Sequence, residues 1–303
     1  MKDDRLLEMR VFKAVVEAGG FTAAARILGV SQPFVSQTIN NLESRLGVQL
    51  LHRSTREQRL SNEGERFLAL SSRTLESLAD AEAEIASSRS QPKGDLRVSA
   101  PLAFGMDQIV SRLPEFMKTY PALKVHLSFS DSIVNLIEEN IDVAIRMGRL
   151  QDSSLISRKL CDLQRIVVAS PDYVARDGAP DRPQDLQKHN CLMWHGSQEH
   201  LNRWPFRIDG KLQEVTARAN VSSDNGQTLF QLCVAGVGIM RCAEHLAIPA
   251  IKSGMLVPLL SQFQGADETA IQAVVLPEQQ RLTRVRAFID YFVDVFRSPP
   301  WHV

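Results

Sequence analysis

Residues 31–46 carry amide and hydroxyl side chains at helical spacing, with very little charge. One face of the predicted helix is apolar, because four residues recur at steps of four, three and four: Val35, Ile39, Leu42 and Leu46. The opposite face is polar and presents Gln32, Ser36, Gln37, Asn40, Asn41 and Ser44. Glutamine and asparagine amides can pair bidentately with adenine in the major groove of DNA. This polar face is therefore predicted to read bases.

A shorter helix is predicted just before this one, across a tight turn. Thr22 is expected to cap a helix over residues 23–28, and Gly29 is expected to end it in the left-handed conformation. Ser31 is expected to cap the second helix, whose first turn tolerates Pro33 because an N–H there has no helical partner. Two helices at this spacing are typical of a helix-turn-helix that binds DNA. An amphipathic helix pair without that role is the alternative.

The flanking segments favour the DNA-binding interpretation. An apolar stripe upstream predicts a third helix that closes a small core: Leu6, Met9, Phe12, Val15 and Val16. Downstream, residues 47–56 begin as a short strand and continue with basic and hydroxyl side chains, as expected of a wing along a phosphate backbone. Residues 1–60 hold nine basic and six acidic side chains, although the formal net charge of the whole chain is zero. The positive excess therefore lies where phosphate is expected.

The amino-terminal domain of the LysR-type transcriptional regulators resembles one long run of this sequence, AAARILGVSQPFVSQTINNLESRLGVQLLHRSTREQRLSNEG. The shared features are the Ala-Ala helix, the V-S-Q-P turn, a recognition helix that ends in L-E-x-x-L-G, and a basic wing. Ser61 replaces the family's usual Thr after the wing, and Thr38 stands where the family often has Arg. The resemblance implies a dimer, or a dimer of dimers, on a pseudo-palindromic site in double-stranded DNA, with RNA polymerase as a further candidate partner. The predicted DNA-binding residues are Thr22, Ser31, Gln32, Pro33, Ser36, Gln37, Asn40, Arg53 and Arg56.

Residues 61–88 contain few turn-forming residues and are predicted to form one long helix. Six positions fall on an a/d heptad seam: Leu68, Ser71, Leu75, Leu78, Glu82 and Ile85. Because a small winged domain offers no surface for such a seam, a second copy of the chain is expected to cover it, with the dimer contact at Leu68, Leu75, Leu78 and Ile85. Residues 87–94 then indicate a flexible hinge. The expected division is a winged helix-turn-helix domain at 1–60, a linker at 61–93 and a further domain at 94–303.

The last two-thirds of the chain alternates predicted strands and helices, which indicates an α/β domain. Strands are expected at residues 96–100, 125–129, 141–147, 166–170, 204–208 and 270–276. Helices are expected at residues 109–117, 134–139, 171–175, 226–235 and 282–296. The alternation favours a parallel sheet, with one hairpin at Asp209 and Gly210. The strand at 270–276 is expected to return to the first set of strands, which ends at residue 147. The chain would then cross twice between lobe I, at about 94–161 and 269–303, and lobe II, at about 162–268.

The resemblance extends to this part, because the family's carboxy-terminal domain is similar to type 2 periplasmic binding proteins and holds a small effector between two lobes. Segments 141–160, 170–180 and 220–239 look especially like the CrgA-like branch of the family. Ligands of open α/β sheets lie at the carboxyl ends of the strands. The candidate effector-binding residues are therefore Ser99, Ala100, Pro101, Ser130, Asp131, Arg146, Met147, Gly148, Ser223, Asp224 and Asn225.

Each candidate has a structural alternative. Ordinary helix capping is the alternative for four of them: Ser130, Asp131, Asp224 and Asn225. Arg146 is expected either to hold an effector carboxylate bidentately or to pair with Asp142. Three further side chains are expected either to wall the cleft or to fill lobe II: Trp194, His195 and Trp204. An anionic effector, an organic acid, is favoured, although the two aspartates would weaken the positive field.

Other classes of protein find little support in the sequence. Its cysteines, Cys161, Cys191, Cys233 and Cys242, lack metal-binding spacing and are expected to be buried, with a redox-sensing pair of Cys233 and Cys242 as the alternative. The first residues lack a signal-peptide core, and no run is long and apolar enough to span a bilayer, so a cytoplasmic location is expected. No nucleophile elbow, phosphate loop or metal motif occurs, so neither enzymatic activity nor a cofactor is expected. A two-lobed solute-binding protein would carry a signal segment and no helix-turn-helix, and an enzyme with a nucleic-acid-binding appendage is a more distant alternative.

Overall fold

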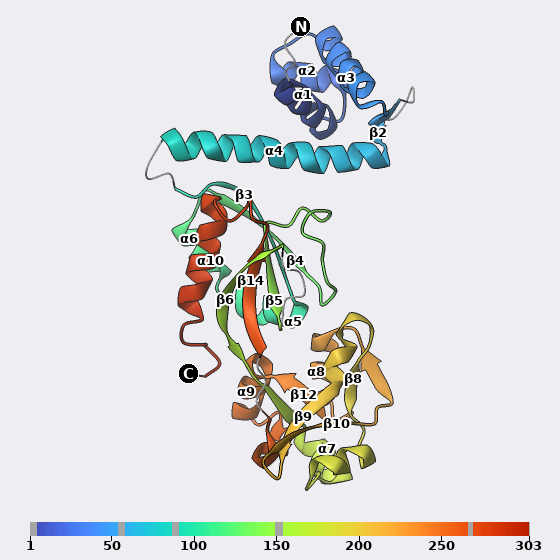
Figure 1. Ribbon diagram of the computed structural model, residues 1–303, viewed down its shortest axis with the longest axis vertical. Helices are drawn as coiled ribbons and strands as arrows, with labels where there is room; N and C mark the ends of the chain where they lie inside the picture. The colour runs from blue at the N-terminus through green and yellow to red at the C-terminus, as the bar shows by residue number, and fades with distance from the viewer. Residues whose placement is uncertain (1–4, 54–57, 87–90, 149–153, 266–268, 303) are drawn as a thin grey trace. The chain divides into compact units, whose positions relative to one another are not determined.

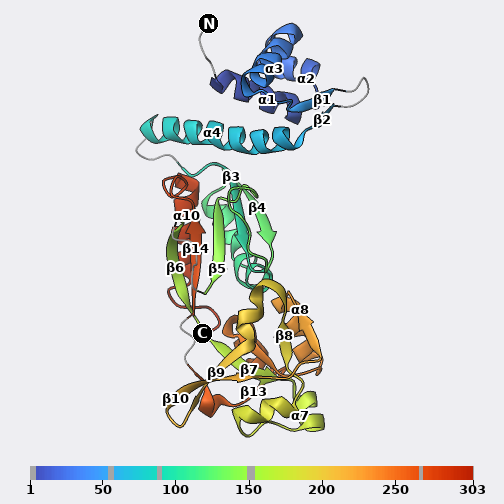
Figure 2. The ribbon, with the colours of Figure 1, turned by 45° about the vertical axis from the view of Figure 1, so that its right-hand side comes forward.

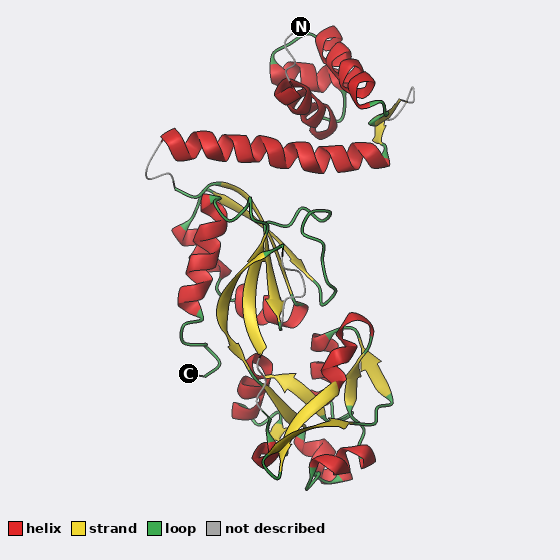
Figure 3. Cartoon of the chain, in the orientation of Figure 1, coloured by secondary structure: helices red, strands yellow, loops and turns green. Residues whose placement is uncertain are grey.

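The computed structural model describes residues 5–53, 58–86, 91–148, 154–265 and 269–302. The chain forms two compact units, Met1–Ser90 and Gln91–Val303 (Figure 1). The first unit contains mainly helices, and the second combines helices with several sheets (Figure 3). Each unit has its own hydrophobic core.

The first unit is a three-helix bundle followed by a short hairpin and a long helix. Its elements are α1 (Arg5–Glu17), α2 (Phe21–Leu28), α3 (Gln32–Leu46), β1 (Leu51–Arg53), β2 (Gln58–Leu60) and α4 (Asn62–Ala86). The predicted apolar stripes meet in one core, which contains Phe12, Val15, Val35, Ile39 and Leu42. Leu46 continues the stripe of α3 in the sequence but is exposed in the last turn of the helix. The small side chains of Ala24 and Ala25 are buried in the same core, which allows α2 and α3 to approach closely.

The capping pattern predicted for α2 and α3 is present at Gly29, Ser31 and Pro33 but not at Thr22. Gly29 ends α2 in the left-handed conformation, with φ of 66°. Ser31 caps α3 by accepting a hydrogen bond from the Phe34 N–H at 3.3 Å, and Pro33 lies in the first turn. The prediction that Thr22 caps α2 is wrong, because α2 begins at Phe21 and the extended Gly20 occupies the capping position, where its carbonyl accepts from the Ala24 N–H.

The wing is an antiparallel pair of strands, in which Leu51 faces Leu60 and Arg53 faces Gln58. Its connecting residues 54–57 lie outside the described residues. One oxygen of the Glu43 carboxylate accepts hydrogen bonds from the Leu50 and Leu51 N–H groups, at 2.8 and 3.1 Å. Glu43 belongs to α3, so this carboxylate anchors the start of the wing to α3.

Helix α4 packs its first half against the core of its own unit. Leu68 and Phe67 contact that core, Ser71 is buried, and the rings of Phe12 and Phe67 meet edge to face at 5.4 Å. The expectation that the seam finds no cover within its own domain is therefore wrong at Leu68 and Ser71. Leu75 and Leu78 are half-buried, and the side chain of Ile85 lies outside the described residues.

Lobe I of the second unit is built on a five-stranded sheet in the order β4-β3-β5-β14-β6. Its strands are β3 (Gly94–Ala100), β4 (Leu123–Phe129), β5 (Val143–Met147), β6 (Ile156–Leu163) and β14 (Thr269–Val275). Strand β3 is parallel to β4 and β5, whereas β14 is antiparallel to β5 and β6, so the prediction of a parallel sheet is wrong for this side. Its helices are α5 (Leu102–Phe104), the π-helical turn η1 (Gly105–Ile109), α6 (Leu113–Thr119) and α10 (Thr283–Val295).

The main core of lobe I lies between this sheet and the aromatic faces of α6 and α10. Phe116 of α6 meets Phe288 of α10 edge to face at 5.6 Å, and both are fully buried. Both ribbon views show α10 running along the sheet beside β6 and β14 (Figures 1 and 2). The predicted terminal helix is therefore confirmed as one wall of the lobe I core.

Lobe II is a mixture of short sheets and helices. Its elements are β7 (Arg165–Ala169), α7 (Pro171–Asp177), η2 (Pro183–Lys188), β8 (Leu192–Trp194), η3 (Gly196–Asn202), β9 (Arg203–Ile208), β10 (Lys211–Thr216), β11 (Val221–Ser223), α8 (Gly226–Val234), β12 (Met240–Ala243), α9 (Glu244–Lys252), β13 (Val257–Pro258) and η4 (Ser261–Phe263). Asp209 and Gly210 turn the β9-β10 hairpin with φ of 49° and 75°, as predicted from their sequence. The chain crosses between the lobes twice, from β6 to β7 and again on the way to β14.

Two predicted helices of lobe I differ in the structure. The region expected as one helix at 109–117 is divided between η1 and α6. Residues 136–140 form turns in place of the helix expected at 134–139, because side chains bind the backbone there. The Asn135 side-chain oxygen Oδ1 accepts from the Ile137 N–H at 3.0 Å, and Glu139 Oε1 accepts from the Asn135 N–H at 3.2 Å.

Candidate functional site

The outer face of α3 is an exposed row of amide and hydroxyl groups. Gln37 donates from Nε2 to Asn41 Oδ1 at 2.8 Å, and Gln32 donates to Ser36 Oγ at 3.3 Å. Asn40 is exposed on the same helix. Thr38 points inward, since it is 8% exposed and donates to the Phe34 carbonyl at 2.8 Å. The side chains expected to read bases are therefore available at the surface of α3, and Thr38 is not among them.

The basic residues around this face have different surroundings. Arg45, in the last turn of α3, donates from Nε to Glu8 Oε2 of α1 at 3.0 Å, so it is engaged within the bundle. The side chain of Arg53 and the whole of Arg56 lie outside the described residues. The ring of Phe34 is 40% exposed beside the amides, an apolar contribution that sequence reasoning missed. Its position just after Pro33, on the polar side of α3, was the available signal.

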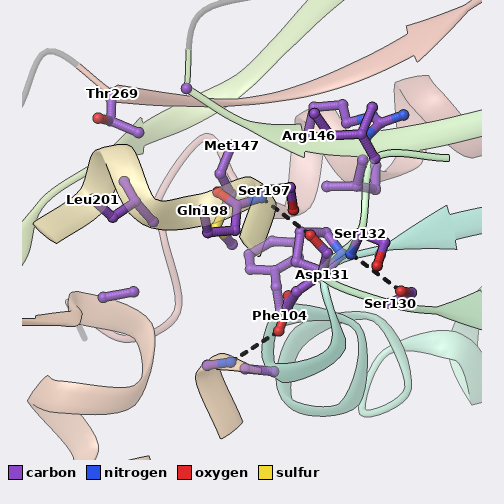
Figure 4. Close-up of a pocket in the computed structure, with 18 of the residues that line it drawn as sticks. Phe104, Ser130, Asp131, Ser132, Arg146, Met147, Ser197, Gln198, Leu201 and Thr269 are labelled. Carbon is purple, nitrogen blue, oxygen red and sulfur yellow. Dashed lines mark hydrogen bonds between the residues drawn. The ribbon is translucent and has the colours of Figure 1, made fainter. Parts of the chain in front are cut away.

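The second candidate site is a cavity of about 1010 Å³ between the two lobes of the second unit. Eight of the eleven predicted effector residues line it: Ser99, Ala100, Pro101, Ser130, Asp131, Arg146, Met147 and Gly148. They lie at the ends of β3, β4 and β5, and several are labelled in the close-up (Figure 4). The other three, Ser223, Asp224 and Asn225, lie beside the cavity at the start of α8. Asn225 caps that helix by accepting from the Thr228 N–H at 2.9 Å.

Asp131 makes the most extensive contacts at this site. Its Oδ1 accepts from the Leu102 N–H of lobe I at 3.2 Å, and its Oδ2 accepts from the Gly226 N–H of lobe II at 2.9 Å. Gln198 of lobe II donates to its backbone carbonyl at 3.1 Å. Burial raises the pKa of the Asp131 carboxyl, and the two backbone N–H donors offset this only in part. Asp131 thus contacts two elements of lobe II across the cavity, α8 through its carboxylate and η3 through its backbone carbonyl.

Arg146 is anchored on the wall of lobe I. Its Nη2 donates to the Val134 carbonyl at 2.6 Å, which holds the turn that replaces the expected helix. Burial lowers the pKa of the Arg146 guanidinium, although Glu139 opposes that effect. Asp142 accepts from the Arg97 N–H at 2.8 Å and from the Gln279 side chain at 3.1 Å. Arg146 therefore has a structural role, but a guanidinium has five N–H donors and keeps capacity for a ligand.

Several lining residues were missed from the sequence. Arg165, Arg203 and Arg241 line the lobe II side, together with His200, His245 and Glu214. The available signal for Arg165 was its position at the first residue of the strand that follows an expected crossing between lobes. Among the three aromatic or histidine candidates of lobe II, Trp194 lines the cavity, His195 is exposed, and Trp204 fills the lobe II core.

A second contact between the lobes lies behind the cavity. The imidazole Nδ1 of the buried His245, on α9, is 3.2 Å from Asp107 Oδ2, on η1, and its ring meets Phe104 edge to face at 5.3 Å. Burial raises the pKa of Asp107, but hydrogen bonds from His245 and Gln108 outweigh it and leave the pKa below the ordinary 3.8. The ionised carboxylate is therefore favoured in the folded state.

We expect Asp107→Asn to lower the thermal unfolding midpoint at pH 7 by about 2 to 4 °C, because the variant loses the ionised partner of His245. A lowered carboxyl pKa contributes stability that is complete above its ordinary value and is lost as the pH falls through the folded-state pKa. The difference between wild type and variant should therefore shrink below about pH 3.8. Thermal scans of both proteins from pH 7 to pH 3 test this, and a constant difference would contradict it.

The four cysteines are buried thiols. All four cysteines are buried, which raises the thiol pKa of Cys161, Cys191 and Cys233 to about 12 and that of Cys242 well above its ordinary value. A reactive thiolate is thus disfavoured at each position. Within the described ranges, no cluster of three His, Cys, Asp or Glu side chains is arranged to hold a metal. None of the helices described is both long and apolar enough to cross a membrane.

Comparison with known proteins assigns both units. Residues 6–65 match the bacterial regulatory helix-turn-helix protein, lysR family, and residues 89–297 match the LysR substrate binding domain. A helix-turn-helix transcriptional repressor of Pseudomonas aeruginosa is 35% identical over 299 residues, which cover 98% of this chain and 94% of the relative. The transcriptional regulator CrgA of Neisseria meningitidis is 34% identical over 290 residues, which cover 95% of each chain.

Solved structures agree with these matches. The structure of CrgA, a LysR-type transcriptional regulator from Neisseria meningitidis, superposes with a TM-score of 0.64 at 32% identity, over 96% of this chain and 98% of CrgA. Full-length AphB, a virulence activator of Vibrio cholerae, superposes with a TM-score of 0.58 at 27% identity, over 96% and 99% of the two chains. The resemblance to the CrgA-like branch, and the expected winged helix-turn-helix and two-lobed fold, are confirmed.

Proposed function

This chain belongs to the LysR family of transcriptional regulators, which join a helix-turn-helix DNA-binding domain to an effector-binding domain, and we propose how its residues divide that work. Residues 1–60 bind DNA, residues 61–93 link and dimerise, and residues 94–303 bind the effector. The observation that carries the proposal is the exposed amide row on α3, ahead of a two-stranded wing. The protein acts in the cytoplasm and needs neither a cofactor nor an enzymatic step.

The recognition helix reads base edges with Gln32, Ser36, Gln37 and Asn40, while the wing residues Arg53 and Arg56 hold phosphates. Ser31 and Pro33 present the first turn of α3 to the DNA, and Thr22 lies in the first turn of α2, where an exposed hydroxyl suits a phosphate contact. Amides give adenine specificity, whereas arginines on phosphates give affinity without sequence information. The site is pseudo-palindromic because two copies of the helix bind it.

We expect Gln37→Ala to reduce discrimination at one base pair of each half-site by about 1 to 3 kcal/mol, because the bidentate amide contact is lost. Arg56→Ala is the contrasting variant. It should weaken binding to all DNA sequences alike and reduce the slope of log affinity against log salt by about one. Quantitative binding to operator variants, at several salt concentrations, measures both effects. Equal protection of unrelated DNA by the wild type would overturn the claim of base reading.

The effector is a small organic acid that binds between the lobes. Its supports are the cavity of about 1010 Å³, the strand ends that line it and the four arginines in its wall, Arg146, Arg165, Arg203 and Arg241. A ligand that touches both lobes favours one arrangement of them, to the extent that its affinity differs between arrangements. Calorimetry with aromatic and aliphatic acids, on wild type and Arg146→Ala, tests this. Equal binding to both proteins would remove Arg146 from the site, and a ligand seen elsewhere in a crystal complex would refute the location.

The regulator works as a homodimer or homotetramer, and the contact between copies is the part of the α4 seam that does not pack on its own unit. RNA polymerase is a further candidate partner. Leu75 and Leu78 follow the part of α4 that packs on its own unit and carry the seam beyond it. A dimer places two recognition helices on the two halves of one DNA site. Sedimentation of the purified protein, with and without DNA, measures the assembly.

A further inference from the structure

Asp131 bridges the effector cavity in a way that capping of a single helix does not explain. Its carboxylate accepts one backbone N–H from each lobe, Leu102 N–H at 3.2 Å and Gly226 N–H at 2.9 Å. Its own carbonyl accepts a third hydrogen bond, from Gln198 of lobe II. Leu102 and Gly226 begin the first helices after β3 and β11, which belong to different lobes. The side chain therefore links the two bodies directly.

The contact at the start of α8 is shaped for this carboxylate. Asn225 satisfies the Thr228 N–H, and Asp131 satisfies the Gly226 N–H, so the two side chains share the free donors of this nine-residue helix. Gly226 leaves room for Trp194 beside this contact, because a Cβ there would lie only 2.8 Å from the Trp194 ring, whereas its distance to Asp131 Oδ2 would be an ordinary 3.9 Å. Trp194 itself lines the cavity. A negative charge at this end of α8 is also favoured by the helix dipole.

We propose that Asp131 is the specificity-determining residue of the effector cavity: an internal anion that occupies the α8 N-terminus, ties lobe II to lobe I and excludes an effector carboxylate from that position. The proposal rests on the proposed function, that this cavity binds the effector. An effector group next to Asp131 must donate hydrogen bonds or be uncharged. The acidic group of the effector is directed instead to the arginines of the cavity wall, which are Arg146, Arg165, Arg203 and Arg241.

Charge repulsion supports this assignment of groups within the cavity. Two carboxylates that share a partly buried position repel each other, and one of them must take up a proton or leave. Burial already raises the pKa of Asp131 despite its two backbone donors, so a second anion beside it is opposed further. Asp224 is exposed and adds negative charge next to the same helix. An effector carboxylate therefore reaches Gly226 only if Asp131 vacates it.

The test replaces the Asp131 side chain with a free anion. Asp131→Ala, in the full chain, should lower the unfolding midpoint of the second unit, and acetate should restore it by about 3 °C in a saturable manner, because acetate refills the vacated carboxylate position. Acetamide and sodium chloride at matched concentration should not restore it.

Asp224→Ala is the matched control, since it removes a neighbouring carboxylate that makes no bond across the lobes. Tryptophan fluorescence follows the transition, because all three tryptophans lie in the second unit. Failure of acetate to stabilise Asp131→Ala above this control would overturn the proposal.

A second measurement decides the question if Asp131→Ala does not fold. Asp131→Asn keeps the side-chain shape but places an NH2 group where one carboxylate oxygen was, so in the observed orientation a donor faces either the Leu102 or the Gly226 N–H and that hydrogen bond is lost. Amide hydrogen exchange in the peptides that contain these two residues should become about tenfold faster in at least one of them relative to Asp224→Ala. Unchanged protection of both would overturn the proposal. Neither measurement uses DNA or an effector, so failure of this inference and failure of the proposed regulator function are separate results.

Discussion

Leu75→Asp combined with Leu78→Asp should dissociate the regulator and raise the dimer dissociation constant at least about a hundredfold, which corresponds to about 2.8 kcal/mol. Both leucines are half-buried on α4, beyond the section that Leu68 and Ser71 pack against the core of the first unit. A carboxylate placed in an apolar seam loses hydration without gaining a partner. Sedimentation across a range of protein concentrations measures the change.

The matched control places the same charges on another face of the same helix. Leu70 and Ser77 are both exposed on α4 and are seven residues apart, so Leu70→Asp with Ser77→Asp adds two carboxylates outside the seam and should leave the assembly intact. DNA binding provides a second readout, because a dissociated protein places one recognition helix on the site where two are needed. If the double leucine variant sediments as the wild-type assembly, the contact between copies lies elsewhere.

Local signals in the sequence predicted local structure well. Gly29 and Ser31 act at the ends of adjacent helices, and Asp209 with Gly210 turns a hairpin between neighbouring strands, so each needs only its own surroundings to form. The recognition helix follows from the same kind of information, because its apolar spacing decides which face is buried. Thr22 was misjudged within this local range, since Gly20 has the extended conformation of the cap and α2 starts at Phe21, two residues earlier than predicted.

Contacts between distant segments account for most of what sequence reasoning missed. The pairing of β14 with β5 and β6 is antiparallel, which no strand pattern in β14 itself indicates. The expected helix at 134–139 is replaced by turns, which Arg146 supports by donating to the Val134 carbonyl. Asp131 could be recognised from the sequence as a helix cap, but one of the two helices that it contacts begins at Gly226, 95 residues further along the chain. The strand-end rule located eight residues of the cavity, whereas the arginines of lobe II needed the folded chain.

Gly64→Ala should destabilise the first unit by about 2 to 3 kcal/mol, because its added methyl group has no space. A Cβ at this position would overlap the carbonyl oxygen of Leu50 and lie 3.0 Å from a methyl carbon of Leu60. Leu50 directly precedes the wing and Leu60 ends its second strand. Gly64 lies in the first turn of α4, where its N–H donates to Ser61 Oγ at 2.9 Å. The backbone of the wing must therefore move away from α4 to admit the methyl group. That movement should also weaken DNA binding, since the wing carries Arg53 and Arg56.

Two spectroscopic probes separate this effect from general instability. The tryptophans Trp194, Trp204 and Trp301 all lie in the second unit, so their fluorescence reports its unfolding, while far-ultraviolet circular dichroism also reports the helices of the first unit. Gly64→Ala should move the helical transition of the first unit to lower denaturant and leave the fluorescence transition in place. Glu63→Ala, at the exposed neighbouring position, should change stability by less than about 0.5 kcal/mol. If both the helical and the fluorescence transition of Gly64→Ala occurred at the wild-type denaturant concentrations, the contact between α4 and Leu50 would be looser than the structure places it.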